Sequence, residues 1–206
     1  EKIVRLPNGF LCYAPEQGMP GVSEPPAVHD QRITFGSFNA LPKINHDVIS
    51  VWSSILHCVP GSRILLKCRE LEDKGARDEI LDLFSENSIG PDRVVLRTRV
   101  PSMAEHLELY SHVDIALDPF PYGGTTTTCE ALWMGVPVIT LAGLRHSSRV
   151  GVSIMTRLDL TELIAPNSEE YVLRAVKLSE DTGKLSVLRR GMRNRMKSSP
   201  LCDSLG

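Results

Sequence analysis

The sequence has few cysteines, and their spacing is not typical of a disulfide framework or of a metal site. The five cysteines form no C-x-x-C pair and show no spacing typical of a metal site: Cys12, Cys58, Cys68, Cys129 and Cys202. An odd, dispersed set of this kind is typical of reduced thiols in a cytosolic protein. We therefore expect a cytoplasmic chain that has no disulfide framework and needs no metal held by cysteines.

Long apolar runs and an excess of charge of one sign are also absent. No stretch approaches the roughly 20 apolar residues that span a bilayer, and the first five residues do not resemble a signal peptide. The formal net charge is −2, so no overall field favours nucleic acid or an anionic membrane. We expect neither as a partner, and local chemistry must bind any anionic ligand.

The first 32 residues differ in composition from the rest. Prolines and glycines in this stretch exclude a long helix and favour an extended connection: Pro7, Gly9, Pro15, Gly18, Pro20, Gly21, Pro25 and Pro26. The sequence begins without Met, as a fragment of a longer protein does. It predicts an interdomain linker at residues 1–32, with little core of its own, followed by one domain at residues 33–206.

From residue 33 onward, short apolar runs alternate with longer helical patterns. The runs with strand character are 33–38, 63–67, 93–96, 113–117 and 137–141. Helices are expected around 48–59, 80–84, 131–134, 169–178 and 184–197. Near-continuous apolar strands between amphipathic helices predict an α/β fold, a Rossmann-like parallel sheet with helices on both faces. Such sheets bind ligands at the carboxyl ends of their strands.

One stretch with the composition of a phosphate site follows the fourth predicted strand. Gly123 and Gly124 allow a close approach of the backbone to a bulky anion. The run Thr125–Thr127 opens a helix, whose free N–H groups and positive dipole end suit a diphosphate. Glu130 follows Thr126 by four residues and shares its helix face. Its carboxylate is a candidate acceptor for both hydroxyls of a ribose.

A second interpretation of the same residues is purely structural. The pattern Thr127-x-x-Glu130 also fits a capping box, in which Glu130 accepts a hydrogen bond from a backbone N–H at the helix start. The residues alone leave both interpretations open. The position directly after a buried strand favours the ligand site.

These motifs resemble those of the O-GlcNAc transferase/SPINDLY family of protein glycosyltransferases. The similarity rests on Asp118–Pro137 and on Ile33–Phe38 with the following Asn39-x-Leu41-x-Lys43-Ile44, and it covers essentially the whole chain. The variant present here is closer to bacterial and SPINDLY-type members than to animal enzymes.

The resemblance implies an architecture larger than this chain. Family members have a GT-B fold, in which two Rossmann-like domains face a cleft, usually preceded by TPR repeats. This chain resembles the carboxy-terminal domain, which binds the nucleotide sugar. The implied partners are then the missing amino-terminal catalytic domain and TPR repeats of the same polypeptide, and this fragment alone is expected to be inactive.

The resemblance also assigns roles to individual residues. Lys43 matches the family lysine that contacts the diphosphate and is the expected catalytic residue, because charge grows there as the nucleoside diphosphate leaves. Without the resemblance it would be taken for a surface lysine closing a turn. Asn39 matches an amide beside the pyrophosphate, although Ala40 replaces a neighbouring amide.

The remaining implied contacts lie further along the chain. The glycine pair at 123–124 and the threonines at 125–127 match the diphosphate site, and Glu130 matches the ribose-binding acid. His106 matches a histidine that packs by the base, although an isolated histidine at a helix start is more often a surface residue. Met103 stands where animal relatives have a lysine.

The expected reaction is transfer of GlcNAc from UDP-GlcNAc to Ser or Thr hydroxyls of proteins. The resemblance implies inversion and no cofactor or required metal. Three alternatives remain open: GDP-fucose as donor, as in SPINDLY-type enzymes; a non-catalytic nucleotide-binding module; and an epimerase-like GT-B relative. No general base for the acceptor is evident in this chain.

Other charged residues are weaker candidates. His146 and Arg149 follow the fifth predicted strand and are plausible neighbours of a sugar or phosphate. His57 and His112 lie within helical patterns and are expected to be structural or exposed. The basic cluster from Arg189 to Lys197 is expected to be a solvated helix face.

Overall fold

A computed structural model describes residues 9–16 and 18–203 of the chain. In this part of the chain a six-stranded parallel sheet has the order β3-β2-β1-β4-β5-β6. The strands are β1 (Thr34–Ser37), β2 (Arg63–Lys67), β3 (Val94–Arg97), β4 (Ile115–Leu117), β5 (Val138–Leu141) and β6 (Ile164–Ala165). Strand order therefore reverses between β1 and β4. The five predicted strands are confirmed, and the two-residue β6 was not predicted.

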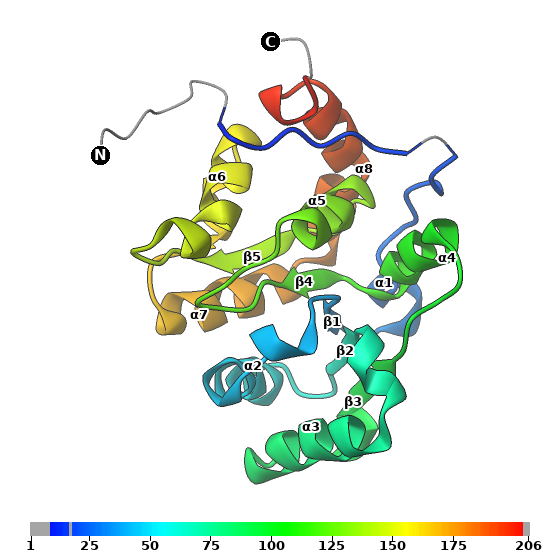
Figure 1. The fold of residues 1–206 in the computed structure, drawn as a ribbon, viewed down its shortest axis with the longest axis vertical. Coiled ribbons are helices and arrows are strands. Elements are labelled where there is room, and N and C mark those ends of the chain that lie inside the picture. Colours follow the sequence, from blue (N-terminus) through cyan, green and yellow to red (C-terminus); the bar gives the residue numbers. More distant parts are fainter. Residues whose placement is uncertain (1–8, 17, 204–206) are drawn as a thin grey trace.

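Helices cover both faces of this sheet (Figure 1). One face carries α2 (His46–Cys58), α3 (Lys74–Glu86) and α7 (Ser168–Ser179), and the other carries α5 (Thr126–Trp133), α6 (Val150–Arg157) and α8 (Thr182–Lys197). The shorter α1 (Ala27–Asp30) and α4 (Met103–Glu108) lie at opposite ends of the strands, α1 beside Asp114 before β4 and α4 beside Lys67 at the end of β2. Sequence analysis missed α6, although its buried residues Val150, Ile154 and Met155 recur at helical spacing.

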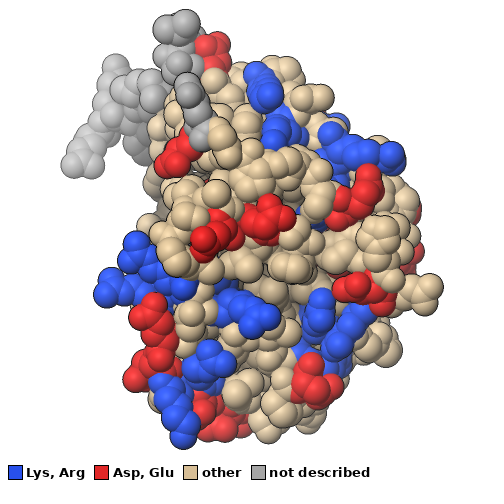
Figure 2. All heavy atoms as spheres, turned by 90° about the vertical axis from the view of Figure 1, so that its right-hand side faces the viewer, with Lys and Arg blue, Asp and Glu red and all other residues tan. Residues whose placement is uncertain are grey.

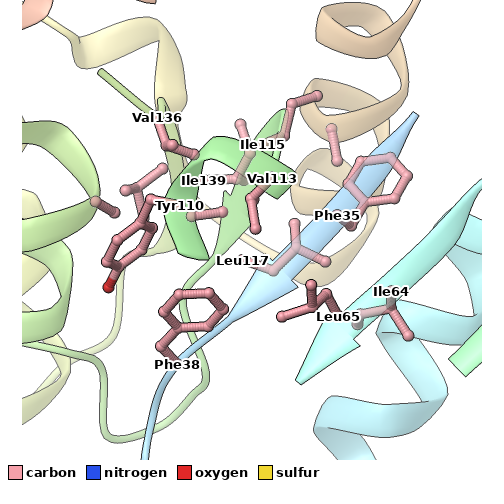
Figure 3. Packing of buried hydrophobic residues seen from close by; sticks show 14 of the residues in the cluster. Phe35, Phe38, Ile64, Leu65, Tyr110, Val113, Ile115, Leu117, Val136 and Ile139 are labelled. Carbon is pink, nitrogen blue, oxygen red and sulfur yellow. The ribbon is translucent and has the colours of Figure 1, made fainter. Parts of the chain in front are cut away.

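The core forms where the strands meet the helices. Figure 3 shows side chains from β1, β2, β4 and β5 packed against one another, among them Phe35, Ile64 and Ile115, each fully buried. Strands buried on both faces need apolar residues at consecutive positions, and β4 is buried at all three of its positions. This explains why the apolar runs identified the strands so reliably.

The expected solvated basic face of α8 is wrong in part. Arg189 is 1% exposed, while Arg190 on the next position is exposed. The Arg189 guanidinium donates to the carbonyl oxygens of Ser23, Val113 and Tyr110 at 2.6–2.8 Å. The reason is helical geometry, because position 189 falls on the same face as the buried Leu185, Met192 and Met196.

The leading segment, defined here as residues 9–16 and 18–31, first runs along the helical layer formed by α5, α6 and α8 and then turns towards α1 (Figure 1). Arg193 of α8 donates to the carbonyl oxygen of Pro20, and the N–H of Tyr13 donates to the carbonyl oxygen of Leu201. Tyr13 and Ala27 are buried against the domain. Residues 1–8 and 17 of the predicted linker lie outside the described residues, and its interdomain role stays a prediction.

Within the described residues, no helix has the length and apolar character to cross a bilayer. All five cysteines are free, and Cys68 and Cys129 are buried.

Candidate functional site

The reversal of strand order between β1 and β4 places several polar side chains at one edge of the sheet. A narrow cavity of about 10 Å³ lies at this point, which is the size of a single water. Its lining includes Asn39, Asp118, Thr127 and Thr128. Crevices at such reversals are where parallel α/β sheets bind their ligands. The structure therefore brings together the two motifs that the sequence placed far apart.

Helix α5 starts inside the threonine run. It begins at Thr126, and the preceding Thr125 makes no side-chain cap. The first N–H groups of a helix have no partner within it and carry the positive end of its dipole. The hydroxyl of Thr127 donates to the Asn39 side-chain oxygen at 3.1 Å, which joins the helix start to the end of β1.

The capping-box interpretation of this helix is wrong. Thr127 lies within α5 rather than at its N-cap position. The Oε2 atom of Glu130 accepts from Nε2 of His106 at 3.0 Å, so it contacts a side chain from α4 and not a backbone N–H. Both side chains are nearly enclosed, with 13% of His106 and 8% of Glu130 exposed.

Lys67 at the end of β2 completes a chain of three polar groups. Its ammonium lies 2.8 Å from Nδ1 of His106. An ammonium only donates, so Nδ1 accepts, and the proton on Nε2 is donated to Glu130. Burial lowers the pKa of Lys67, and the Glu130 carboxylate opposes that shift. Sequence analysis missed Lys67, whose one available signal was its place at the carboxyl end of a predicted strand.

An aromatic wall, formed by the rings of Phe38 and Tyr110, lies beside Lys67, His106 and Glu130. The Phe38 and Tyr110 rings lie 4.4 Å apart between centroids (Figure 3), and the His106 ring lies 5.8 Å from Phe38. The Tyr110 hydroxyl donates to the carbonyl oxygen of Thr127 at 3.2 Å. The wall therefore supports both His106 and the first turn of α5.

Lys43 ends the 3₁₀ turn Leu41–Lys43 that follows β1. Its Nζ donates to the carbonyl oxygen of Gly123 at 2.9 Å and lies 4.4 Å from the centre of the exposed Tyr122 ring. Burial lowers the pKa of Lys43, whereas the nearby Asp118 carboxylate raises it. The predicted lysine and the predicted glycine pair therefore meet directly.

Asp118, directly after β4, is a buried carboxylate to which sequence analysis assigned no role. It is 2% exposed. Its Oδ1 accepts from the N–H of Gly124 at 2.6 Å, and its Oδ2 accepts from the Thr140 hydroxyl at 2.9 Å. Burial raises the pKa of Asp118 to about 6, against the opposing effect of these hydrogen bonds and of Lys43.

Two open hollows flank the site. One of about 410 Å³ is lined by Lys43, Asn45 and the Phe120–Tyr122 turn, together with Pro42. The other, of about 330 Å³, lies beside Phe38: Ala40, Lys67, Cys68, Arg69, Glu70 and Arg99 complete its lining. Figure 2 shows that charges of both signs are interspersed over one face of the molecule, without a broad region of one sign.

The weaker candidates have local partners. His146 is exposed, and its ring lies 4.9 Å from that of Phe10. The guanidinium of Arg149 donates to the carbonyl oxygen of Gly143. His57 and His112 are exposed, as expected. Among the residues that the structure describes, no three His, Cys, Asp or Glu side chains are grouped to hold a metal ion.

Comparison with known proteins identifies the family. Residues 24–205 match the family described as Glycosyl transferase family 41. The chain belongs to glycosyltransferase family 41. It is 44% identical over 98% of its length to a probable UDP-N-acetylglucosamine–peptide N-acetylglucosaminyltransferase SPINDLY of Solanum lycopersicum. It is 32% identical over 84% of its length to the UDP-N-acetylglucosamine–peptide N-acetylglucosaminyltransferase of Caenorhabditis elegans, covering 15% of that protein.

A solved structure extends the match to the fold. A mutant of the Thermobaculum terrenum O-GlcNAc transferase superposes on this chain with a TM-score of 0.90 and 33% identity, over 99% of this chain and 38% of that one. The predicted family and the Rossmann-like half of a GT-B fold are thereby confirmed. The family 41 chain spans 22% of the length of the SPINDLY relative. The roles that the resemblance implies for single residues stay predictions.

Proposed function

We propose that this family 41 chain is the donor-binding half of an inverting protein O-glycosyltransferase, which transfers GlcNAc from UDP-GlcNAc to Ser or Thr hydroxyls. The observation that carries the proposal is the convergence of three groups at the reversal of strand order. They are the Lys43 ammonium, the open start of α5 and the Glu130 carboxylate. The names of the relatives support the choice of donor and acceptor.

In the proposed mechanism, the diphosphate of the donor lies at the start of α5. The first N–H groups of the helix and the Thr125–Thr127 hydroxyls donate to its oxygens. Lys43 moves from the Gly123 carbonyl oxygen to the diphosphate, and its ammonium stabilises the charge that grows on the leaving nucleoside diphosphate. Burial lowers the pKa of Lys43 in the protein without a donor. A diphosphate that binds beside Lys43 therefore gives this poorly solvated cation an anionic partner.

The nucleoside would lie towards α4. Glu130 Oε2 is already bonded to His106, so Oε1 is the oxygen proposed to accept from the ribose. His106, held by Lys67 on one side and Glu130 on the other, then presents its ring beside the base. Lys67 thus sets the orientation of two groups that contact the donor.

The rest of the reaction is proposed to depend on other parts of the polypeptide. The base for the acceptor hydroxyl would come from the amino-terminal catalytic domain or from the substrate, and TPR repeats would present the protein acceptor. No metal is required in this proposal, because Lys43 and the helix start meet the charge of the diphosphate. We propose that the enzyme acts in the cytoplasm and that this chain alone transfers no sugar.

The hollow beside Phe38 favours a second candidate donor, GDP-fucose. Its lining carries Lys67, Arg69 and Arg99. The O6 and N7 atoms of guanine accept hydrogen bonds from such cations, whereas uracil has no equivalent pair of adjacent acceptors. A non-catalytic nucleotide-binding module is the remaining alternative.

Calorimetric titration distinguishes these proposals. The natural polypeptide that contains this chain is titrated with UDP, GDP, UDP-GlcNAc and GDP-fucose, and transfer to an acceptor protein is followed with each sugar. Tighter binding of UDP together with GlcNAc transfer is the expected result. Preference for GDP together with fucose transfer would identify GDP-fucose as the donor in place of UDP-GlcNAc. Binding without any transfer would indicate a non-catalytic nucleotide-binding module.

A further inference from the structure

A single peptide group connects Lys43 to the buried carboxylate of Asp118. The N–H of the Gly123–Gly124 peptide donates to Asp118 Oδ1 at 2.6 Å, and the carbonyl oxygen of the same peptide accepts from Lys43 Nζ at 2.9 Å. The lysine therefore rests on a peptide whose orientation the aspartate sets. The same bond removes the Gly124 N–H from the donors available to a phosphate.

The space around Asp118 is shaped for a carboxylate. Oδ2 accepts from Thr140 of β5 at 2.9 Å, and the Thr128 hydroxyl of α5 lies 3.5 Å from Oδ1. A Cβ atom at Gly123 would lie 2.6 Å from Oδ2, and one at Gly151 would lie 3.0 Å from it. Two glycines, one in the loop after β4 and one in α6, thus leave room for the acid.

Burial of Asp118 disfavours the negative charge of its side chain, yet the carboxyl group keeps that charge at pH 7. The pKa of Asp118 is raised to about 6 by burial, so the group is mostly ionised at pH 7. The titratable groups that face it are Lys43 from the turn after β1 and Tyr171 from α7, whose hydroxyl donates to the Asp118 carbonyl oxygen. An asparagine has a single side-chain oxygen, so it could not accept from both the Gly124 N–H and the Thr140 hydroxyl as the carboxylate does.

We propose that Asp118 is a positioning residue for Lys43: its carboxylate orients the Gly123–Gly124 peptide that holds the ammonium, and its negative charge favours the ammonium form at the mouth of the donor site. The effect on sugar transfer rests on the proposed function of Lys43. The effect on the pKa of Lys43 does not depend on that proposed function.

The test compares Asp118→Asn with Asp114→Asn in the natural polypeptide that contains this chain. Asp114, at the other end of β4, is equally buried but bonds to the N–H groups of Ala27 and Thr34. Asp118→Asn is expected to lower kcat by about 10- to 100-fold, the scale of a small misplacement, with little change in KM for the donor and an equal or higher Tm at pH 7. Asp114→Asn is expected to leave kcat close to that of the wild type.

A second readout needs no sugar transfer. The rate at which Lys43 is acetylated by acetic anhydride is measured against pH by mass spectrometry, which reports the pKa of Lys43. Asp118→Asn is expected to lower that pKa, and Asp114→Asn to leave it unchanged. An unchanged pKa of Lys43 together with wild-type kcat in Asp118→Asn would overturn the proposal.

Two further outcomes are also informative. If Asp118→Asn does not fold, the wild-type protein decides: kcat is expected to fall as the pH is lowered through about 6, and this acid limb should persist in His106→Gln. Loss of the limb in His106→Gln would assign it to the histidine and overturn the proposal. If the wild-type polypeptide transfers no sugar, the proposed function fails, while the Lys43 pKa still tests the positioning role.

Discussion

Strand β4 carries a buried aspartate near each end, and the two ends of the sheet differ in what surrounds them. Asp114, at the amino end, accepts from the backbone N–H groups of Ala27 and Thr34 and lies near the buried Arg189. Asp118, at the carboxyl end, accepts from Gly124 and Thr140 beside Lys43. Burial raises the pKa of both carboxyl groups.

The difference lies in what each cluster holds in place. At the amino end, Asp114 and Arg189 bond mostly to backbone groups of segments that are remote in sequence, and they attach the leading segment to the domain. At the carboxyl end, Lys43 and Lys67 each line an open hollow. Equivalent buried charges therefore attach the leading segment to the domain at one edge and lie beside the proposed donor site at the other. Substitutions at the two edges should separate stability from function.

The largest expected effect is at the carboxyl edge. Lys43→Ala should lower turnover in the natural polypeptide by about 10²–10³-fold, the scale of losing one preorganised donor. Donor affinity should fall by only about 1–2 kcal/mol, because the charge on the leaving group grows in the transition state. Steady-state kinetics and calorimetry check both values.

Two further variants test how the Lys43→Ala result is interpreted. Lys43→Arg should restore little activity, since a planar guanidinium does not reproduce a compact ammonium. Lys74→Ala, at an exposed position of α3, is the control. Near-normal turnover of Lys43→Ala at saturating donor would leave Lys43 a role in binding alone.

The next largest effect is a loss of stability, expected at the amino ends of the strands. Arg189→Met should lower the free energy of unfolding by about 3 kcal/mol, because buried carbonyl oxygens lose their donors. Nucleotide affinity of the folded protein should stay unchanged. Denaturant unfolding of Arg189→Met and of the exposed-site control Arg190→Met measures the contrast. Equal stability of the two variants would contradict the assignment of Arg189 to the fold.

The third prediction concerns pH and Asp118. Its pKa is raised from 3.8 to about 6 in the folded state, so the folded protein binds the proton more tightly than the unfolded chain. Relative to Asp118→Asn, the wild type should therefore lose stability as the pH rises from about 4 to about 7. The shift corresponds to about 3 kcal/mol at most. Urea unfolding of both proteins across this range provides the measurement, and parallel curves would exclude the raised pKa.

The smallest effect is expected at Glu130. Glu130→Gln should weaken nucleoside diphosphate binding by about tenfold, because one charge-assisted hydrogen bond to the ribose is lost. Stability should change little, since the amide oxygen still accepts from His106. Calorimetry and thermal melts on the same protein test this, with the exposed Glu105→Gln as control. Unaltered binding would remove Glu130 from the proposed site.

Much of the fold was predictable because its signals are local. The five long strands follow from consecutive apolar residues, and α2 and α8 follow from helical spacing. The weakest elements escaped prediction: β6 has two residues, and α6 follows a loop with no clear boundary. Arg189 was misjudged because its neighbours in sequence are basic, whereas its neighbours on the helix face are Leu185 and Met192.

The site was predictable where residue type and position agreed. Lys43, the glycine pair and the threonine run were identified from motifs, and the structure brings them together at one edge of the sheet. Lys67 belongs to no motif, and Asp118 opens the motif Asp118–Pro137 without an assigned role. Their importance depends on the groups that face them across the sheet.

The sequence by itself determined the strand and helix pattern, the α/β class and the family, because periodicity and motifs are properties of neighbouring residues. Tertiary structure alone decided which charges meet. Lys43 and Gly123 are 80 residues apart, and Lys67 and His106 are 39 apart. Such contacts depend on strand order and on how helices pack over the sheet. Burial then sets the pKa of each group, since the loss of water around a charge arises only when the whole domain has closed around it.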